Sequence, residues 1–359
     1  FYVILEHFAD NSEEKELADY GMMFWGNLNH EYLEAAMGYP SNFSWINYQQ
    51  RGWNDPHVIG YMESHDEERM VYKNINFGNS QGNYNVKDPR TALRRAELAA
   101  TLFFPIPGPK MFWQFGEVGY DFSINRCTDG TIAPNCRLSR KPIRWDYLQD
   151  PDRFRLFRVF STLIELKTTH PTFQTTDFAV DLSSVGKRIH LNHDSMDVTI
   201  LGNFDVEAIS INPGFQETGT WYEYFTGEQL DVLSVSAPIE LAPGEYRMYT
   251  NVELPGPDIP TSVNAPQVNA LDLQVFPNPA RESVTFAYTL DLNVPVQLLV
   301  YDLTGRPVDN LASSSQGSGR QQLTWDGRNE QGQLLPGGVY LYRLTTGEAV
   351  TSGNLVLTR

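Results

Sequence analysis

The first 172 residues alternate short apolar runs with stretches of helical periodicity. The apolar runs lie at residues 2–5, 22–25, 58–62 and 110–115. Each run has the length of a strand, and the segments between them are long enough to contain a helix. Strands that alternate with helices in this way form a parallel sheet or an α/β barrel. The pattern therefore predicts an α/β fold over residues 1–172.

Three of the intervening segments carry helix start and stop signals. Asn11 predicts the N-terminal cap of a helix that ends at Gly21. Asp-Pro pairs at 88–89 and 150–151 predict the starts of two further helices, because proline suits the first helical position. The second of these helices is expected to end at His-Pro, residues 170–171.

From residue 173 onward the pattern changes to strands and turns alone. Residues 173–252 hold short apolar runs separated by Gly, Pro and Asn, which predicts an antiparallel β-sandwich domain. Residues 253–270 are rich in proline and polar residues and predict a linker. Residues 271–359 again alternate as half-buried strands do, so they predict a second, immunoglobulin-like β-sandwich.

Composition narrows the classes of function. The formal net charge of −17 over 359 residues argues against nucleic acid as a partner, because a phosphate backbone requires a basic surface. An acidic chain with 13% aromatic residues suits a neutral polysaccharide. No apolar run approaches the roughly 20 residues of a transmembrane helix. Phe1 opens the first apolar run, so we expect the chain to begin in the middle of a fold.

Two cysteines, Cys127 and Cys136, lie close together among loop-forming residues. One interpretation is a short-loop disulfide formed in an oxidising compartment, and the other is a pair of free thiols in a surface loop. Zinc is not expected, because no second Cys/His pair with ligand spacing lies nearby.

Three of the four predicted strands end in carboxylates. Glu6 follows the first strand, Glu63 and Asp66 follow the third, and Glu117 follows the fourth. The C-terminal ends of parallel strands meet at one edge, so we expect these acids to converge. Paired carboxylates at such an edge are what glycoside hydrolysis requires.

Each of these residues also has a structural interpretation. Glu6 could pair with a cation at a strand end, and His65-Asp66 could be a hydrogen-bonded pair that supports the fold. Glu117 could support loop geometry instead of chemistry. Tryptophans such as Trp25 and Trp113 could stack on sugar rings, although core packing is the more common role.

Several segments, in this order, resemble the α-amylase family of glycoside hydrolases. Glu-Ser-His-Asp-Glu-Glu-Arg at 63–69 looks like the family's strand-seven motif, in which His-Asp is followed by Arg. Residues 107–117 resemble the eighth strand and its Gly-Glu loop. Residues 141–145 resemble the segment that follows the barrel strands, and residues 163–171 resemble the helix that leads into the family's β-sandwich, domain C. The resemblance implies the C-terminal half of a (β/α)8 TIM barrel, strands five to eight, followed by domain C.

The resemblance also implies roles for individual residues. Glu6, at the end of what would be strand five, matches the general acid/base, and Asp66 matches the carboxylate that stabilises the transition state. His65 matches the residue that hydrogen-bonds sugar hydroxyls, while Arg69 and Glu117 are expected to contribute to substrate binding. The implied reaction is retaining hydrolysis of a starch-like α-glucan.

Two motifs of that family are absent. Its nucleophile is an Asp in a Gly-x-Arg-x-Asp motif on strand four, and an Asn-His motif precedes it on strand three; neither occurs in this sequence. We therefore expect the parent protein to be an enzyme and this polypeptide to be an inactive fragment. No cofactor is assigned to the residues present. Calcium, which the family often binds, would be held by the missing N-terminal half.

The last segment resembles the C-terminal sorting domains of type IX secretion substrates. Phe-Pro-Asn-Pro at 276–279, the segment 300–306 and Gly-Gly-Val-Tyr-Leu-Tyr-Arg-Leu at 337–344 carry this resemblance. It implies secretion, or attachment to the outer surface of a Bacteroidetes-type bacterium, with the type IX machinery as a partner. The alternative is a generic accessory sandwich, such as a carbohydrate-binding module or a hook-capping-type fold.

The leading hypothesis is thus a secreted hydrolase whose ligands are α-glucan polysaccharides or oligosaccharides. Branching enzymes and transglycosylases share the same motifs. A non-catalytic surface glycan-binding protein with a degenerate barrel is the alternative from another class. A structural adhesin is a third class, but it would not need Glu6 and the His65-Asp66 pair.

Overall fold

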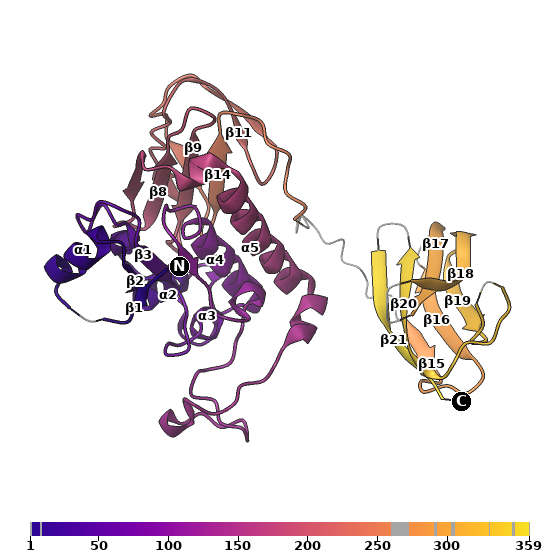
Figure 1. Cartoon of the computed structure of the whole chain (residues 1–359). Coiled ribbons are helices and arrows are strands. Elements are labelled where there is room, and N and C mark those ends of the chain that lie inside the picture. The colour runs from indigo at the N-terminus through magenta and orange to yellow at the C-terminus, as the bar shows by residue number, and fades with distance from the viewer. Residues whose placement is uncertain are drawn as a thin grey trace. The chain divides into compact units, whose positions relative to one another are not determined.

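The computed structural model (Figure 1) describes residues 2–7, 9–259, 273–290, 293–302, 306–329, 331–346 and 349–358. The chain divides into two compact units, residues 1–260 and 261–359. Most of the predicted linker, from residue 260 to residue 270, lies outside the described residues. The same holds for Phe1 and for positions 303–305 of the 300–306 segment.

The first unit begins with a parallel sheet of four strands: β1 (Ile4–Leu5), β2 (Met23–Asn27), β3 (Val58–Tyr61) and β6 (Lys110–Met111). The strands lie side by side in chain order and run in one direction. Sequential order is the order found in an α/β barrel. Within the described part of the chain the sheet stays open, so the α/β class is confirmed while a closed barrel is not observed.

Helices occupy the connections between these strands (Figure 1). The α-helices of the described residues are α1 (Asn11–Asp19), α2 (Asn29–Met37), α3 (Met70–Phe77), α4 (Pro89–Thr101) and α5 (Pro151–Thr169), and a small hairpin pairs β4 (Ser80–Gln81) with β5 (Tyr84–Asn85). The starts predicted for α4 and α5 are confirmed: the carboxylates of Asp88 and Asp150 cap the first backbone N–H groups of these helices. The sequence analysis did not identify α2 and α3.

Two local predictions are wrong in detail. Asp10, not Asn11, is the residue before α1, because the Asn11 side chain is engaged elsewhere. Its Nδ2 donates to the Arg51 carbonyl at 2.8 Å, and its Oδ1 accepts from Trp53 Nε1 at 3.0 Å. The fourth strand is also shorter than predicted. It ends at Met111, and the chain turns at Phe115, whose φ of 66° is rare for a residue other than glycine.

An antiparallel domain follows, as predicted for residues 173–252. Its six-stranded sheet has the spatial order β12-β11-β14-β9-β8-β7. The strands are β7 (Phe178–Asp181), β8 (Gly186–Leu191), β9 (Val198–Asn203), β11 (Gly219–Glu223), β12 (Gln229–Val232) and β14 (Tyr246–Thr250), and a separate pair joins β10 (Ile209–Ile211) to β13 (Ile239–Leu241). This sheet shares one apolar core with the helices, including Leu98 of α4 and Ile200 of β9.

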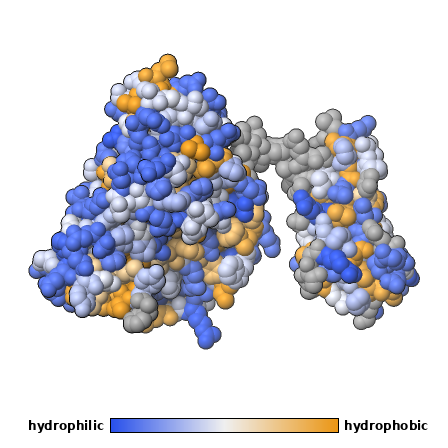
Figure 2. All heavy atoms as spheres, turned by 45° about the horizontal axis from the view of Figure 1, so that its top comes forward, coloured by the Kyte–Doolittle hydropathy of each residue, from blue (hydrophilic) through white to orange (hydrophobic). Residues whose placement is uncertain are grey.

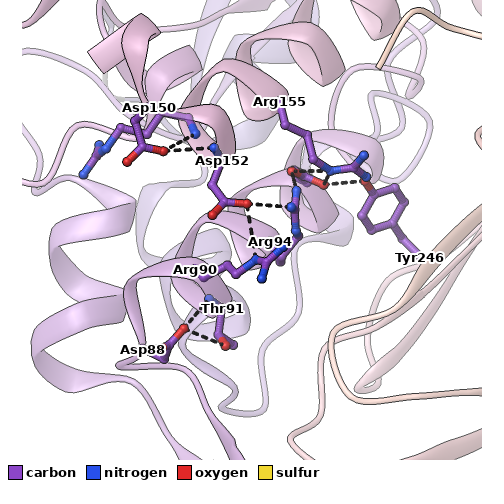
Figure 3. A network of polar contacts seen from close by, with 10 residues as sticks. Asp88, Arg90, Thr91, Arg94, Asp150, Asp152, Arg155 and Tyr246 are labelled. Carbon is purple, nitrogen blue, oxygen red and sulfur yellow. Dashed lines mark hydrogen bonds and ion pairs between the residues drawn. The ribbon is translucent and has the colours of Figure 1, made fainter. Parts of the chain in front are cut away.

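A fully buried carboxylate joins α4 to both α5 and the antiparallel sheet (Figure 3). Glu97 accepts a hydrogen bond from the Tyr246 hydroxyl at 2.7 Å and pairs with Arg155 Nε at 3.2 Å. Arg94 pairs with Glu97 as well, and its second nitrogen reaches Asp152 at 2.9 Å. Three elements thus converge on one buried charge, which is stable only because it is fully paired.

Arg95, also fully buried, carries the opposite charge and joins α4 to α2 and to the residues after β9. Its guanidinium donates to the carbonyls of Ala35 and Ala36 at the end of α2, at 2.6 and 2.8 Å. It also donates to the carbonyls of Phe204 and Asp205 after β9, at 2.6 and 3.0 Å. Strand β9 packs so closely against α4 that a Cβ atom on Gly202 would lie 2.7 Å from the Leu98 side chain.

The second unit is a β-sandwich. One sheet has the order β15-β16-β19 and the other β18-β17-β20-β21. The strands are β15 (Gln274–Phe276), β16 (Val284–Leu290), β17 (Val294–Tyr301), β18 (Pro307–Gln316), β19 (Gly319–Trp325), β20 (Gly338–Thr346) and β21 (Ala349–Leu357). Trp325 is fully buried in its core. The immunoglobulin-like sandwich predicted for this segment is therefore supported.

Hydrophilic side chains cover much of the face of the first unit seen in Figure 2, with smaller apolar patches between them. Among the described residues, no helix has the length and apolar character that a membrane crossing requires.

Replacing Glu97 by Gln should destabilise the first unit by roughly 3 kcal/mol, because two arginines lose their buried partner. Asp152→Asn is the matched control. Its carboxylate pairs with the same Arg94 but is 31% exposed, so its loss should cost less than about 1 kcal/mol. Urea unfolding followed by circular dichroism measures both changes. Equal midpoints for the two variants would contradict the role given to Glu97.

Candidate functional site

The ends of the four parallel strands bring the predicted site residues to one edge of the sheet. Glu6 follows β1, Asn27 ends β2, the segment 63–69 follows β3, and the segment 113–117 follows β6. Parallel strands direct their carboxyl ends the same way, so their terminal side chains share a common space.

Tyr61 is the last residue of β3 and lies at the same edge of the sheet as these acids. Burial, followed by the charges of Glu67, Asp66 and Glu6, raises the pKa of its hydroxyl to about 12. These charges belong to residues that follow two different strands, β1 and β3. Trp25 of β2 packs edge-on against the same ring, with 6.1 Å between the centroids.

His65 and Asp66 stand at the open side of this edge, with side chains 66% and 47% exposed. His65 Nε2 lies 3.3 Å from Asp66 Oδ2. The other carboxylate oxygen, Oδ1, lies 3.1 Å from Arg137 Nη2, and the backbone N–H of Asp66 donates to Ser64 Oγ at 3.0 Å. The carboxylate is thus held from two sides while it stays accessible to a ligand.

The next two residues fasten neighbouring segments to the end of β3. Glu67 Oε1 accepts from Asn27 Nδ2 at 2.7 Å, which links the ends of β2 and β3. Glu68 accepts from Ser123 Oγ and from the backbone N–H of Ile124, both at 2.7 Å. The long connection after β6 is therefore anchored to the site by one carboxylate.

Arg69 lies beneath this edge, with 6% of its surface exposed. Its Nη1 is 3.4 Å from Glu63 Oε2, and Glu63 Oε1 accepts from the backbone N–H of Met70 at 2.6 Å. The guanidinium carbon lies 5.9 Å from the centroid of Trp113 and 5.3 Å from that of Tyr120. Arg69 thus supports the rings beside the site, and its predicted contact with substrate stays a prediction.

Glu117 lies in the 3-10 turn η2 (Gly116–Val118), and its Oε2 is buried without a hydrogen-bond partner among the described residues. Burial raises the pKa of this carboxyl, and the charge of Glu63 raises it further. Burial also raises the pKa of Glu63, although Arg69 opposes the shift. The pKa values of two carboxyl groups near the exposed site are therefore both raised by burial.

A pocket of about 230 Å³ opens beside His65. Trp113, Tyr120 and Phe122 line it with aromatic surface, and the His65 ring lies 5.7 Å from the Trp113 ring. Aromatic faces next to a few hydrogen-bonding groups are typical of small-molecule sites.

The sequence analysis did not identify the connection between β6 and α5 as part of this site. Residues 112–150 contain only short 3-10 turns, namely η2, η3 (Pro134–Cys136) and η4 (Trp145–Gln149). The predicted disulfide between Cys127 and Cys136 is confirmed, and it directly precedes Arg137. The length of this connection could have indicated a functional role, because long connections without regular structure are commonly functional.

No group of three or more His, Cys, Asp or Glu side chains that could hold a metal ion occurs among the described residues. The calcium ion implied by the resemblance concerned residues outside this sequence, so it stays a prediction.

One family model matches the chain, that of the FlgD Ig-like domain, over residues 278–349. This match agrees with an immunoglobulin-like sandwich in the second unit, and it names a family other than the type IX sorting domains. No curated protein matches the sequence.

Solved structures of α-amylases resemble the chain over 71% of its length. AmyP in complex with maltose has a TM-score of 0.53 at 13% identity, over 71% of this chain and 56% of that one. The α-amylase from Geobacillus thermoleovorans, complexed with acarbose, has a TM-score of 0.51 at 14% identity, over 71% and 54%. The Anoxybacillus α-amylase gives 0.50 at 14% identity, over 71% and 53%.

The chain therefore spans about half the length of the solved structures that it matches. At these identities the likeness shows the fold alone. The first unit has an α-amylase-type fold.

The pKa shift of Glu117 predicts a pH-dependent stability. A carboxyl whose pKa is higher in the folded than in the unfolded chain makes stability fall as pH rises through that interval. Glu117→Gln should therefore be more stable than the wild type at about pH 7.5 and nearly equal to it at about pH 4. Thermal unfolding at both pH values measures the difference. Glu16→Gln, an exposed change on α1, is the control, and a pH-independent effect of Glu117→Gln would contradict the assignment.

Proposed function

We propose that the strand-end site is the acid/base half of an active site that hydrolyses α-glucans with retention. One observation carries the proposal: the parallel strands β1 and β3 end at one edge of the sheet, and Glu6 and Asp66 follow them there. The α-amylase-type fold supports it, as do the maltose and acarbose complexes of two structural neighbours.

The positions of Glu6 and Asp66 suit two different catalytic roles. Glu6 is exposed at the end of β1, where it can protonate the oxygen of a glycosidic bond. Asp66, oriented by Arg137, can stabilise the positive charge that develops on the sugar ring. His65 is exposed beside it and can hydrogen-bond sugar hydroxyls.

The retaining mechanism needs a further carboxylate about 5–5.5 Å from the acid to act as the nucleophile. The strand-four motif that supplies it in the α-amylase family does not occur in this sequence. We therefore propose that the 359-residue chain binds an α-glucan without cleaving it, and that cleavage belongs to the parent protein.

Binding can be tested on the chain itself. Asp66→Asn should weaken the affinity for maltoheptaose about tenfold, because a charged hydrogen-bond acceptor is lost. Asp231→Asn, an exposed change on β12, is the matched control and should bind like the wild type. Calorimetric titration measures all three affinities. Equal binding by Asp66→Asn would exclude this carboxylate from the sugar site.

Catalysis can be tested on a product of the gene that carries a Gly-x-Arg-x-Asp segment. There, Glu6→Gln should lower the kcat for starch hydrolysis by roughly 10²–10⁴, as expected for a lost general acid. Glu13→Gln, which removes a nearby carboxylate paired with His7, should retain activity. If no gene product contains that segment and the chain still binds maltoheptaose, the non-catalytic glycan-binding function replaces the enzyme.

We also propose that the second unit directs secretion by the type IX route, so that the protein is released or held at the outer surface. The motifs at 276–279 and 337–344 support this proposal, and the compact sandwich is compatible with it.

A reporter protein fused to residues 271–359 should leave the cytoplasm of a Bacteroidetes host and reach the medium or the outer surface. In a strain without the type IX translocon it should stay inside the cell. A fusion to residues 173–252 is the control. Cell fractionation and immunoblotting distinguish the outcomes, and retention in the wild-type host would favour an accessory FlgD-like module.

A further inference from the structure

The connection that covers the site reverses the charge of the rest of the protein. Between Tyr120 and Trp145 the sequence contains five Lys or Arg residues and two Asp residues, a net charge of +3 in a chain of −17. The basic residues are Arg126, Arg137, Arg140, Lys141 and Arg144. Such a local concentration of positive charge attracts anions.

Two of these basic residues, Arg137 and Lys141, line the pocket beside His65. Arg69, Arg137 and Lys141 line it together with His65, and none of the described residues that line it is an Asp or a Glu. The volume of about 230 Å³ equals roughly seven water molecules, which gives room for a charged substituent.

Carboxylates pair with two of the three cations, Arg69 and Arg137, although none of these carboxylates lines the pocket. Glu63 is buried against Arg69, and Asp66 accepts from Arg137 on the outer side. Glu68 accepts from Ser123 Oγ, and Ser123 itself lines the pocket. The protein therefore orients its cations without filling the pocket with negative charge.

Lys141 is rigidly placed. Its ammonium group donates to the carbonyl oxygens of Cys136 and Ser139 at 2.8 and 2.9 Å, which folds the segment after the disulfide around it. Desolvation lowers its pKa and the charge of Glu68 opposes this, while the charges of Arg126 and Arg69 lower it further. The charges of Arg126 and Arg69 thus repel that of Lys141, and a bound anion would offset this repulsion as the carboxylate of Glu68 does.

Further cations lie close to the same pocket. The guanidinium carbons of Arg126 and Arg144 lie 4.9 and 5.5 Å from the centre of the Phe122 ring. Arg144 is paired with Asp146 at 2.8 Å, so it adds less to the field than Arg126.

We propose that this pocket, which adjoins the sugar site proposed above and rests on that function, binds an anionic substituent of the saccharide, such as a phosphate monoester. A phosphate monoester carries a charge of about −1.5 to −2 at neutral pH and offers three acceptor oxygens. Arginine and lysine side chains are the usual protein partners of such a group. The site would then prefer phosphorylated α-glucans over neutral ones.

The experiment compares two ligands that differ only in charge: maltopentaose, and maltopentaose with one 6-phosphate group. Calorimetric titration into the whole chain at about 50 mM NaCl should show about tenfold tighter binding of the phosphorylated ligand. The advantage should shrink at about 500 mM NaCl, where exposed charges are screened, while the affinity for maltopentaose should change little.

Arg137→Gln and Arg140→Gln separate the pocket from the general charge of the connection. Both remove one positive charge, but Arg140 is exposed and does not line the pocket. The ratio of the two affinities should fall to near one in Arg137→Gln and stay as in the wild type in Arg140→Gln. An unchanged ratio in Arg137→Gln would overturn the assignment of the pocket.

The remaining outcomes separate this inference from the proposed function. Equal affinities for the two sugars overturn the inference and leave the α-glucan site standing. If neither sugar binds, the proposed function fails, and titration with inorganic phosphate decides the inference. Phosphate binding that is lost in Arg137→Gln would support an anion site, and absent phosphate binding would overturn it.

Discussion

Helix α4 carries two fully buried charges of opposite sign, Arg95 and Glu97, and the arrangement of the first unit depends on how they are paired. An unpaired buried charge would destabilise the fold by several kcal/mol, so each must find complete partners. Arg95 finds them on α2 and after β9, and Glu97 finds them on α5 and β14. The two charges therefore fix the antiparallel sheet against the helices that carry the parallel strands.

The strand-end site lies on the parallel sheet of the same unit. The parallel strands bring Glu6 and Asp66 to one edge by direction alone, since strands without a common direction would scatter them. The connection after β6 then closes over that edge, anchored by Glu68 and by the Cys127–Cys136 disulfide. An acidic group from a strand end, Asp66, and a basic group from the connection, Arg137, consequently pair beside the pocket, a combination that neither element contains by itself.

Buried residues behind the pocket explain why its exposed groups can stay exposed. Arg69 is held between Glu63 and the rings of Trp113 and Tyr120, so the aromatic wall is supported from beneath. The unpartnered Glu117 oxygen lies at the turn that follows Trp113, next to a second buried carboxyl. The buried carboxyls of Glu63 and Glu117 therefore lower the stability of the fold at the edge where ligand contact is proposed, as functional sites often do.

The sequence by itself determined the α/β class of the first segment, the two strand-only regions, the caps of α4 and α5, and the position of acids after strand ends. These follow from hydrophobic periodicity, capping residues and strand direction, which are local properties of the chain. The charge reversal between Tyr120 and Trp145 was equally readable, because it needs only a count of residues.

Only the tertiary structure decided which of these residues meet. Asn11 caps no helix because Arg51 and Trp53, about 40 positions away, engage its amide. Arg69 is buried by Glu63, and Arg137 reaches Asp66 across 71 positions. Such contacts depend on how separate elements pack, and packing is decided by the shape and charge of partners that are distant in sequence.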